Sequence, residues 1–578
     1  MRHLGSVLLT LSLLLSTARA QQPPDLILHG GKIATVDDEF RIAEAIAIAG
    51  ERIVAVGTDG EVLKLRGDDT NVVDLAGKLV LPGLMDSHTH SGGAAMTEFD
   101  HELPDMHSVE DVLDYIESRT RAVPEGEWIA VRQVFITRLR ERRYPTRAEL
   151  DRVAPKHPVV FSTGPDAAVN SLALSTSGID KDFRVVGSGQ IERDPVTGEP
   201  TGILRGGTQR YLKGSPPTRE ATAEDRARRL AQLLADYNSV GITSIGDRST
   251  SESDLARYAA LLEQGKLTVR VAASYRVETS GELDEVISQI DRVAKHPLRR
   301  DDPMLRVIGI KTFLDGGMLT GSAYMRQPWG VSEIYSIRDP DYRGVLFIPP
   351  ERLVPIVRAT IERKLQFTAH SVGDGAVHTL LDAYEQVSRE MPIRETRPCI
   401  THSNFMSHEA VETMARLGVV ADIQPAWLYL DTGTLVAQFG YDRLRYFQPL
   451  RTIFEQDVIA GGGSDHMQKI GSLRSINPYN PFLGMWVTIA RQARNFDRPL
   501  HPQEALSREQ AIRFYTANNA YLLFHEHRTG TLEIGKLADL IVLDRDILTC
   551  PVDDIRDTKV LSTYLGGRLV YSAEQPAE

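Results

Sequence analysis

Two histidines separated by a single residue, His88 and His90, are the first residues in this sequence whose types and spacing could do chemistry. They follow the apolar run Leu79-Val80-Leu81. On an extended chain, side chains two residues apart project from the same face. Neutral imidazole is the commonest metal ligand in proteins, so the pair could share an ion. Because the chain contains 16 His, the pair could also arise by chance, and the interpretation depends on further ligands.

Four further polar residues lie towards the carboxyl ends of segments that we expect to be strands. The segments are 305–317, 367–370, 399–402 and 458–465, and the residues are Lys311, His370, His402 and Asp465. Each has a structural alternative: a lysine that extends to solvent, a histidine hydrogen-bonded in the core, or an aspartate that caps a turn or helix. The ordered set on successive strand ends is hard to obtain from packing demands alone, so we favour an active site.

The elements that must position these residues alternate between helix and strand from about residue 83 to residue 525. Leu230, Leu233, Leu234 and Tyr237 recur at helical spacing before the strand-like segment 241–247. Similar units occupy 353–370 and 410–423. Repeated helix-to-strand units predict an α/β fold, most simply a (β/α)8 TIM-like barrel, with its chemistry at the carboxyl ends of the strands. Residues from about 100 to 220 fit this alternation poorly and predict an inserted α+β segment.

Both ends of the chain contain short strand-like segments. They occupy 25–36 and 45–57 near the N-terminus, and 538–544 and 560–571 near the C-terminus. Neither end has enough strands to bury a core alone. We therefore expect one composite β-sandwich formed by residues 21–82 and 526–578, with the barrel at 83–525 between them.

The first twenty residues have the pattern of a secretory signal peptide. A basic start at Arg2 precedes the apolar run Leu4–Leu15, and Ala18-Arg19-Ala20 is a small-x-small cleavage signal. The apolar run is too short to span a bilayer comfortably. Residues 1–20 therefore predict export, to the periplasm or out of the cell, with no membrane span left after cleavage.

Composition limits the partners of this chain. Its 578 residues carry a net charge of −12, and removal of Arg2 and Arg19 with the leader would make it −14. This balance argues against nucleic acid and gives no basic surface for anionic membranes. A small-molecule substrate is the expected partner, and a homodimer is left open. The two cysteines, Cys399 and Cys550, predict free thiols, because neither spacing nor context indicates a bridge.

Taken together, these motifs resemble the amidohydrolase superfamily, in particular its YtcJ-like or amidohydrolase 3 branch, which includes N-substituted formamide deformylases. The similarity covers essentially the whole chain after the leader. It is carried by Gly83-Leu84-Met85-Asp86-Ser87-His88-Thr89-His90, Ile310-Lys311-Thr312-Phe313-Leu314-Asp315-Gly316, Ala369-His370-Ser371-Val372-Gly373-Asp374, Thr401-His402, Gly463-Ser464-Asp465 and Gly530-Thr531-Leu532-Glu533-Ile534-Gly535-Lys536-Leu537-Ala538-Asp539-Leu540.

The resemblance implies two divalent metal ions, with zinc expected and Fe, Mn or Ni as alternatives. His88, His90 and Asp465 would bind the first ion and His370 and His402 the second, with a carboxylated Lys311 as the bridge. Asp465 would also be the catalytic residue that moves a proton during hydrolysis of an amide-type C–N bond. The alternatives are a deaminase with one metal ion and a non-catalytic binding or regulatory protein on the same fold.

Overall fold

An eight-stranded parallel sheet forms the centre of the molecule. The computed structural model describes residues 23–132, 134–187, 189–216 and 219–574, so the expected signal peptide lies outside the described residues. In sheet order, the strands are β8 (Leu84–Thr89), β14 (Ile242–Thr250), β15 (Arg270–Arg276), β16 (Leu305–Phe313), β17 (Gln366–Ser371), β18 (Cys399–His402), β19 (Val420–Ile423) and β20 (Ala460–Gly462).

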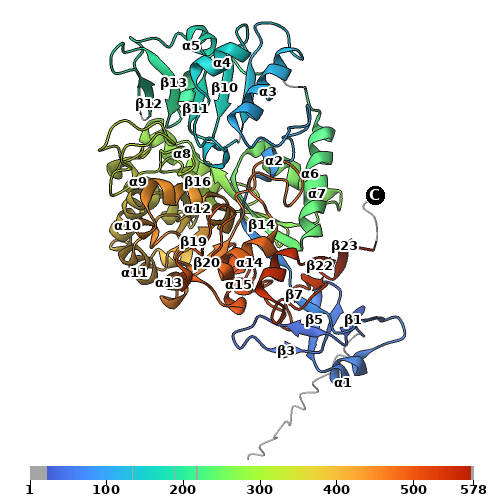
Figure 1. The fold of residues 1–578 in the computed structure, drawn as a ribbon. Coiled ribbons are helices and arrows are strands. Elements are labelled where there is room, and N and C mark those ends of the chain that lie inside the picture. The colour runs from blue at the N-terminus through green and yellow to red at the C-terminus, as the bar shows by residue number, and fades with distance from the viewer. Residues whose placement is uncertain (1–22, 133, 188, 217–218, 575–578) are drawn as a thin grey trace, which may run out of the picture.

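Helices connect and cover these strands, which gives the (β/α)8 barrel predicted from the sequence (Figure 1). They are α6 (Ala223–Ser239), α7 (Glu252–Glu263), α8 (Leu283–Ala294), α9 (Pro350–Glu362), α10 (Asp374–Ser388), α11 (His408–Leu417), α12 (Pro425–Phe439) and α13 (Leu450–Glu455), with α14 (Pro481–Ala490), α15 (Arg508–Phe514) and α16 (Ala517–Leu522) after the last strand.

Helix α6 shows how local sequence sets these elements. Thr222 and Asp225 form a reciprocal capping box at its N-terminus, which satisfies backbone N–H groups that lack a partner in the first turn. The apolar residues predicted at helical spacing are buried: Leu230, Leu233, Leu234 and Tyr237. The helix therefore starts where its cap dictates and packs its apolar stripe against the barrel.

The barrel closes at the strand ends that bear the first histidines. Backbone hydrogen bonds run from Asp465 N to His88 O and from His90 N to His466 O, both at 2.8 Å. An isolated parallel bridge joins Thr89 to His466. Asp465 lies three residues beyond β20, not at the strand end itself as expected from the sequence. This extension of the chain past β20 is what carries Asp465 across to β8.

The predicted insertion follows β8 and precedes α6 in the chain, and it forms a layer of its own. Its five-stranded sheet contains β12 (Gln190–Arg193), β13 (Pro200–Arg205), β11 (Ala167–Val169), β10 (Val159–Ser162) and β9 (Ile129–Arg132). The helices α3 (Val109–Thr120), α4 (Arg147–Val153) and α5 (Ser171–Ser177) accompany it. Figure 1 shows this layer at one end of the barrel, with the β-layers of the chain termini towards the opposite end.

Strands from both ends of the chain share one sheet. Its order is β23 (Arg568–Ser572), β22 (Val560–Leu565), β21 (Leu540–Leu543), β7 (Leu79–Pro82), β2 (Lys32–Ala34) and β3 (Ile42–Ala43). A second sheet contains β5 (Arg52–Gly57), β4 (Ala45–Ala49), β1 (Leu26–His29) and β6 (Asn71–Asp74). Residues of both sheets, such as Ile46 and Leu540, bury one common core.

Among the described residues, no helix has the length and apolar character needed to cross a membrane. Cys399 is buried and Cys550 is partly buried, and both are free, as predicted.

Candidate metal centre

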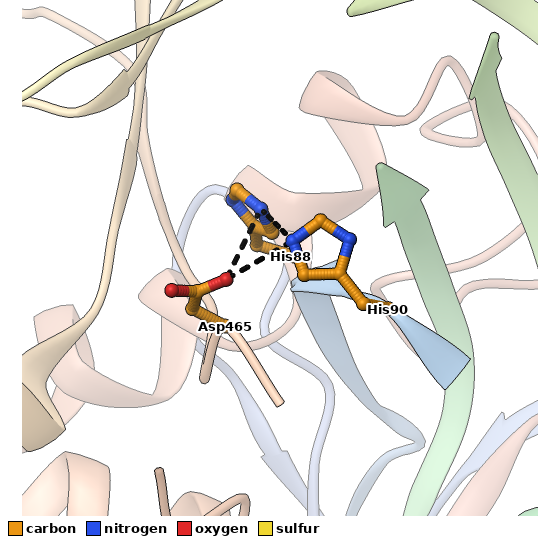
Figure 2. A group of neighbouring side chains, drawn as sticks. All are labelled: His88, His90 and Asp465. Atoms are coloured by element: carbon orange, nitrogen blue, oxygen red, sulfur yellow. Dashed lines mark hydrogen bonds and ion pairs between the residues drawn. The ribbon is translucent and has the colours of Figure 1, made fainter. Parts of the chain in front are cut away.

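Three of the six predicted ligands meet at the closing edge of the barrel. The Nε2 atom of His90 lies 3.2 Å from Asp465 Oδ1, and the Nε2 atom of His88 lies 3.5 Å from the same oxygen. The two Nε2 atoms are 3.3 Å apart. Figure 2 shows the three side chains pointing toward one another, His88 and His90 from the end of β8 and Asp465 from beyond β20.

The outer nitrogens of these two histidines are held by acceptors. His88 Nδ1 lies 3.0 Å from Asp422 Oδ2, and His90 Nδ1 lies 2.7 Å from the carbonyl oxygen of Arg248. Because a carbonyl oxygen only accepts, His90 Nδ1 donates to Arg248, and this bond turns the Nε2 atom towards Asp465 and His88. A hydrogen bond to the second ring nitrogen is the usual way in which a protein orients a metal-binding histidine.

The other two histidines lie next to this group and are held in the same manner. The ring centroids of His370 and His402 are 4.4 Å apart, and those of His88 and His402 are 5.0 Å apart. His402 Nδ1 lies 2.7 Å from Gln424 Oε1, and His370 Nε2 lies 3.3 Å from the carbonyl oxygen of Gly316. Within the described residues, Nε2 of His402 and Nδ1 of His370 make no hydrogen bond.

Asp422 and Gln424 connect the two halves of the site, and the sequence analysis did not single them out. Asp422 Oδ1 accepts from Ser87 Oγ at 2.7 Å and from Gln424 Nε2 at 2.8 Å, while Oδ2 faces His88. The amide of Gln424 is thereby oriented with its oxygen towards His402. A charged residue inside the apolar stretch Val419–Ile423 was the only signal in the sequence.

Lys311 is buried in the barrel without a hydrogen-bond partner. Its side chain is 1% exposed, and Nζ has no partner among the residues that the structure describes. Burial is the largest cause that lowers the pKa of Lys311, to about 8. A neutral amine is the form that reacts with carbon dioxide to give a carbamate, so this environment favours the modification expected at Lys311.

Two of the predicted ligands adopt backbone angles that are rare for residues with a side chain. The φ angle is +79° at His402 and +55° at Asp465. Left-handed geometry at non-glycine residues costs about 1–3 kcal/mol and is concentrated at functional sites. In both cases the residue ends or follows a barrel strand, where this turn directs the side chain into the site.

The donor set fits divalent metal ions. Four imidazoles, one carboxylate and one amine suit borderline ions such as zinc, and an acceptor holds one ring nitrogen of each imidazole. In the part of the chain that the structure describes, His88, His90 and Asp465 form the one group of three or more His, Cys, Asp or Glu residues whose ligand atoms all lie within 4.8 Å of one another. Lys311, His370 and His402 lie beside this group and are not gathered into it.

Comparison with known proteins shows the fold and the family of this chain. A crystal structure of a metal-dependent hydrolase from Pyrococcus furiosus aligns with a TM-score of 0.64 at 23% identity, covering 91% of this chain and 100% of that chain. This likeness shows that the two chains share a fold. A family model for the amidohydrolase family matches residues 71–571, and the chain belongs to that family.

Two relatives match this chain over nearly its whole length. One is an N-substituted formamide deformylase from Arthrobacter pascens, 29% identical over 95% of this chain and 99% of the relative. The other is a putative amidohydrolase YtcJ from Bacillus subtilis, 25% identical over 94% of this chain and 99% of the relative. The protein is a metal-dependent hydrolase that acts on carbon–nitrogen bonds other than peptide bonds.

Proposed function

We propose that this protein is an exported amidohydrolase with two metal ions, which hydrolyses an amide-type C–N bond of a small molecule. The observation that carries the proposal is that each of the four histidines has one ring nitrogen held by an acceptor, while the Nε2 atoms of His88 and His90 converge on Asp465 Oδ1 at 3.5 and 3.2 Å. Zinc is the proposed ion, held by His88, His90, His370, His402 and Asp465, with a carboxylated Lys311 between the two subsites.

Divalent ions in such sites supply Lewis acidity, which makes water a better nucleophile near neutral pH and polarises a carbonyl group. The protein contributes position and proton transfer. Asp465 has an oxygen at 3.2–3.5 Å from both Nε2 atoms of the first histidine pair, so its carboxylate lies where the attacking water must be oriented. We assign Asp465 to accept the proton of that water and to deliver it to the leaving nitrogen as the C–N bond breaks.

Lys311 separates the proposed function from its alternatives. A deaminase of the same superfamily with one metal ion does not need a bridging lysine, and a binding protein does not need any free ligand nitrogens. Here Lys311 Nζ is buried with no hydrogen-bond partner among the described residues, which costs free energy in the absence of a compensating role. This cost favours the two-metal hydrolase.

The experiment compares the metal content of wild-type protein with that of Lys311→Ala, both loaded with zinc and bicarbonate. Loss of the bridge should reduce the content from about two ions per chain to one or none, because the second subsite then has only two imidazoles. The exposed Lys295→Ala is the matched control and should retain both ions. Hydrolysis of a panel of small amides is measured on the same samples.

The alternatives give different results. One ion per chain in both wild type and Lys311→Ala would contradict the bridge and favour the deaminase. Full metal loading with tight ligand binding and no turnover of any amide would favour the binding protein.

A further inference from the structure

A cavity of about 500 Å³ lies between the barrel and the insertion. Its walls come from the segment that follows β8, including the short helix α2 (Ser91–Ala94), from α3 and β9 of the insertion, from the N-terminal part of α6 and from the segment after β20. None of the six predicted metal ligands lines it. The metal centre described above therefore does not account for this space.

The cavity begins close to the metal ligands along the chain. Gly93 lines it three residues after His90, and Met467 lines it two residues after Asp465. His90 directly follows β8 and Asp465 lies three residues beyond β20, so both lie on the carboxyl-end face of the barrel, where barrel enzymes bind their substrates. The position fits a pocket for the part of a substrate that extends away from the bond that is broken.

The walls of the cavity are largely apolar and rich in polarisable groups. They include Met96, Phe99, Met106, Trp128 and Met467. Methionine adapts to irregular shapes and aromatic rings contact flat or alkyl groups well, so this lining suits an aromatic or long aliphatic body. A volume of about 500 Å³ is within the usual range for small-molecule sites.

The charges around the cavity have the opposite sign to the protein as a whole. Four arginines line it, Arg119, Arg132, Arg219 and Arg226, against a single acidic residue, Asp100. The carboxylate of Asp100 is already engaged, 2.8 Å from His101 Nδ1 and 3.9 Å from Arg119. The net charge of the chain is −12, so this cluster is a local exception.

Three of these arginines have no ion pair. Within the described ranges, no carboxylate lies within 4.0 Å of the side-chain nitrogens of Arg132, Arg219 or Arg226. The guanidinium of Arg219 lies 4.7 Å from the centroid of the Phe99 ring, so the positive charge is next to the apolar wall of the cavity. Guanidinium groups beside an apolar wall are well suited to hold a planar carboxylate.

We propose that this cavity binds an organic anion with an apolar or aromatic body, and that it selects amide substrates that carry a carboxylate distant from the scissile C–N bond. The apolar body occupies the cavity and the carboxylate binds the arginines. The substrate part of this inference rests on the proposed function, whereas the binding part does not.

The binding test uses two ligands of similar shape, 4-phenylbutyrate and 4-phenyl-1-butanol, titrated calorimetrically into the zinc-loaded protein. The carboxylate should bind at least about fivefold more tightly than the alcohol, and Arg226→Gln should weaken its binding by about five- to tenfold. Arg228→Gln is the matched control, because Arg228 lies on the same helix, does not line the cavity and pairs with Asp225. It should leave both affinities unchanged.

Two results would overturn the proposal. Equal affinities for the carboxylate and the alcohol would remove the role of charge. The carboxylate could also bind tightly and keep the same affinity in Arg226→Gln and in the double variant Arg132→Gln/Arg226→Gln. That result would place the ligand on the metal ions instead of in the cavity.

A kinetic test separates this inference from the proposed function. N-acetyl-4-(aminomethyl)benzoate and N-acetyl-4-(hydroxymethyl)benzylamine differ only in the group distant from the amide, which is a carboxylate in the first and a hydroxymethyl group in the second. Arg226→Gln should raise the KM for the first by about five- to tenfold with little change in kcat, and should leave the second unaffected. If 4-phenylbutyrate binds as expected but neither amide is hydrolysed, the amide chemistry fails while the anion site stands. Equal KM values for the two amides would refute the selection of anionic substrates.

Discussion

At the scale of single residues, Asp422 decides whether the ligands of the metal centre are correctly oriented. Both of its oxygens accept, one from Ser87 and Gln424 and the other from His88. In Asp422→Asn, the NH2 group that replaces one oxygen cannot accept from these donors. We expect the affinity for zinc to fall about 10- to 100-fold, the usual effect of losing an outer partner of a metal-binding histidine. Competition with a chelator measures it.

Asp431→Asn provides the control for this variant. Asp431 is equally buried, but its oxygens accept from Thr137 and Arg138, away from the predicted ligands. Its replacement should lower the thermal midpoint and leave the zinc affinity unchanged. A loss of zinc affinity of the same size in both variants would mean that general destabilisation, and not ligand orientation, explains the effect of Asp422.

The second prediction at this scale concerns the pH dependence of the metal-free protein. Burial, with the charge of Lys311, lowers the pKa of His370 to about 3. In the unfolded chain the pKa is about 6.5, so this histidine stabilises the fold above that pH, and its contribution is lost as the pH falls from about 6.5 to 3. When the pH is lowered from 7 to 5, the free energy of unfolding of metal-free wild type should therefore fall by about 2 kcal/mol more than that of metal-free His370→Asn. Parallel thermal stability curves against pH would contradict this.

The residues that could be predicted from the sequence are those whose type alone is unusual at a strand end. His88, His90 and Asp465 meet as the family resemblance implies, and Lys311 is buried, while its role as a bridge stays a prediction. The partners that orient them could not be predicted. The acceptor for His90 is the main-chain oxygen of Arg248, which carries no side-chain signal, and the link from Asp422 to His88 depends on how the barrel closes.

At the scale of elements, the same limit applies to barrel closure. The alternation of helix and strand predicts the parallel sheet, but not how closely β8 and the segment after β20 approach. Gly463 shows this distance: a Cβ atom there would lie 2.9 Å from both Cβ and N of His88 and 2.8 Å from Ser87 Oγ. Main-chain atoms cannot move aside cheaply, so a glycine is needed where β20 meets β8.

Gly463→Ala should therefore push β8 away from the segment after β20, which carries Asp465. We expect a cost of about 1–3 kcal/mol from overpacking, seen as a lower thermal midpoint, together with loss of the ion bound by His88, His90 and Asp465. Gly60→Ala is the matched control, because no atom lies within 4 Å of its added Cβ and it lies in the short helix α1 (Asp59–Val62). Full metal content in Gly463→Ala would show that the closing edge tolerates the extra methyl group.

At the scale of the whole molecule, the two ends of the chain are joined through β7 and β21. Ile541 pairs with Leu81 and Val542 with Val80, and β8 with its histidines follows two residues after β7. The sequence predicted that both ends must combine, because neither has enough strands. It did not predict that β1 and β2 enter different sheets, since the turn at Gly30 and Gly31 resembles that of a hairpin.

The proposed export of the protein makes a prediction at this same scale. Among the described residues, the N-terminal segment is hydrogen-bonded to the fold at Pro24, whose carbonyl oxygen accepts from Thr70, and at Asp25, whose N–H donates to Ile48. Cleavage after Ala20 would therefore remove none of these contacts and would leave Gln21 as the new N-terminus.

Intact mass and N-terminal sequencing of protein produced in a secreting host should give a chain that starts at Gln21. Replacing Ala18 and Ala20 by arginine should block processing. A chain that retains Met1 and remains in the cytoplasm would refute export without affecting the metal centre, because the contacts that position the ligands all lie after residue 80.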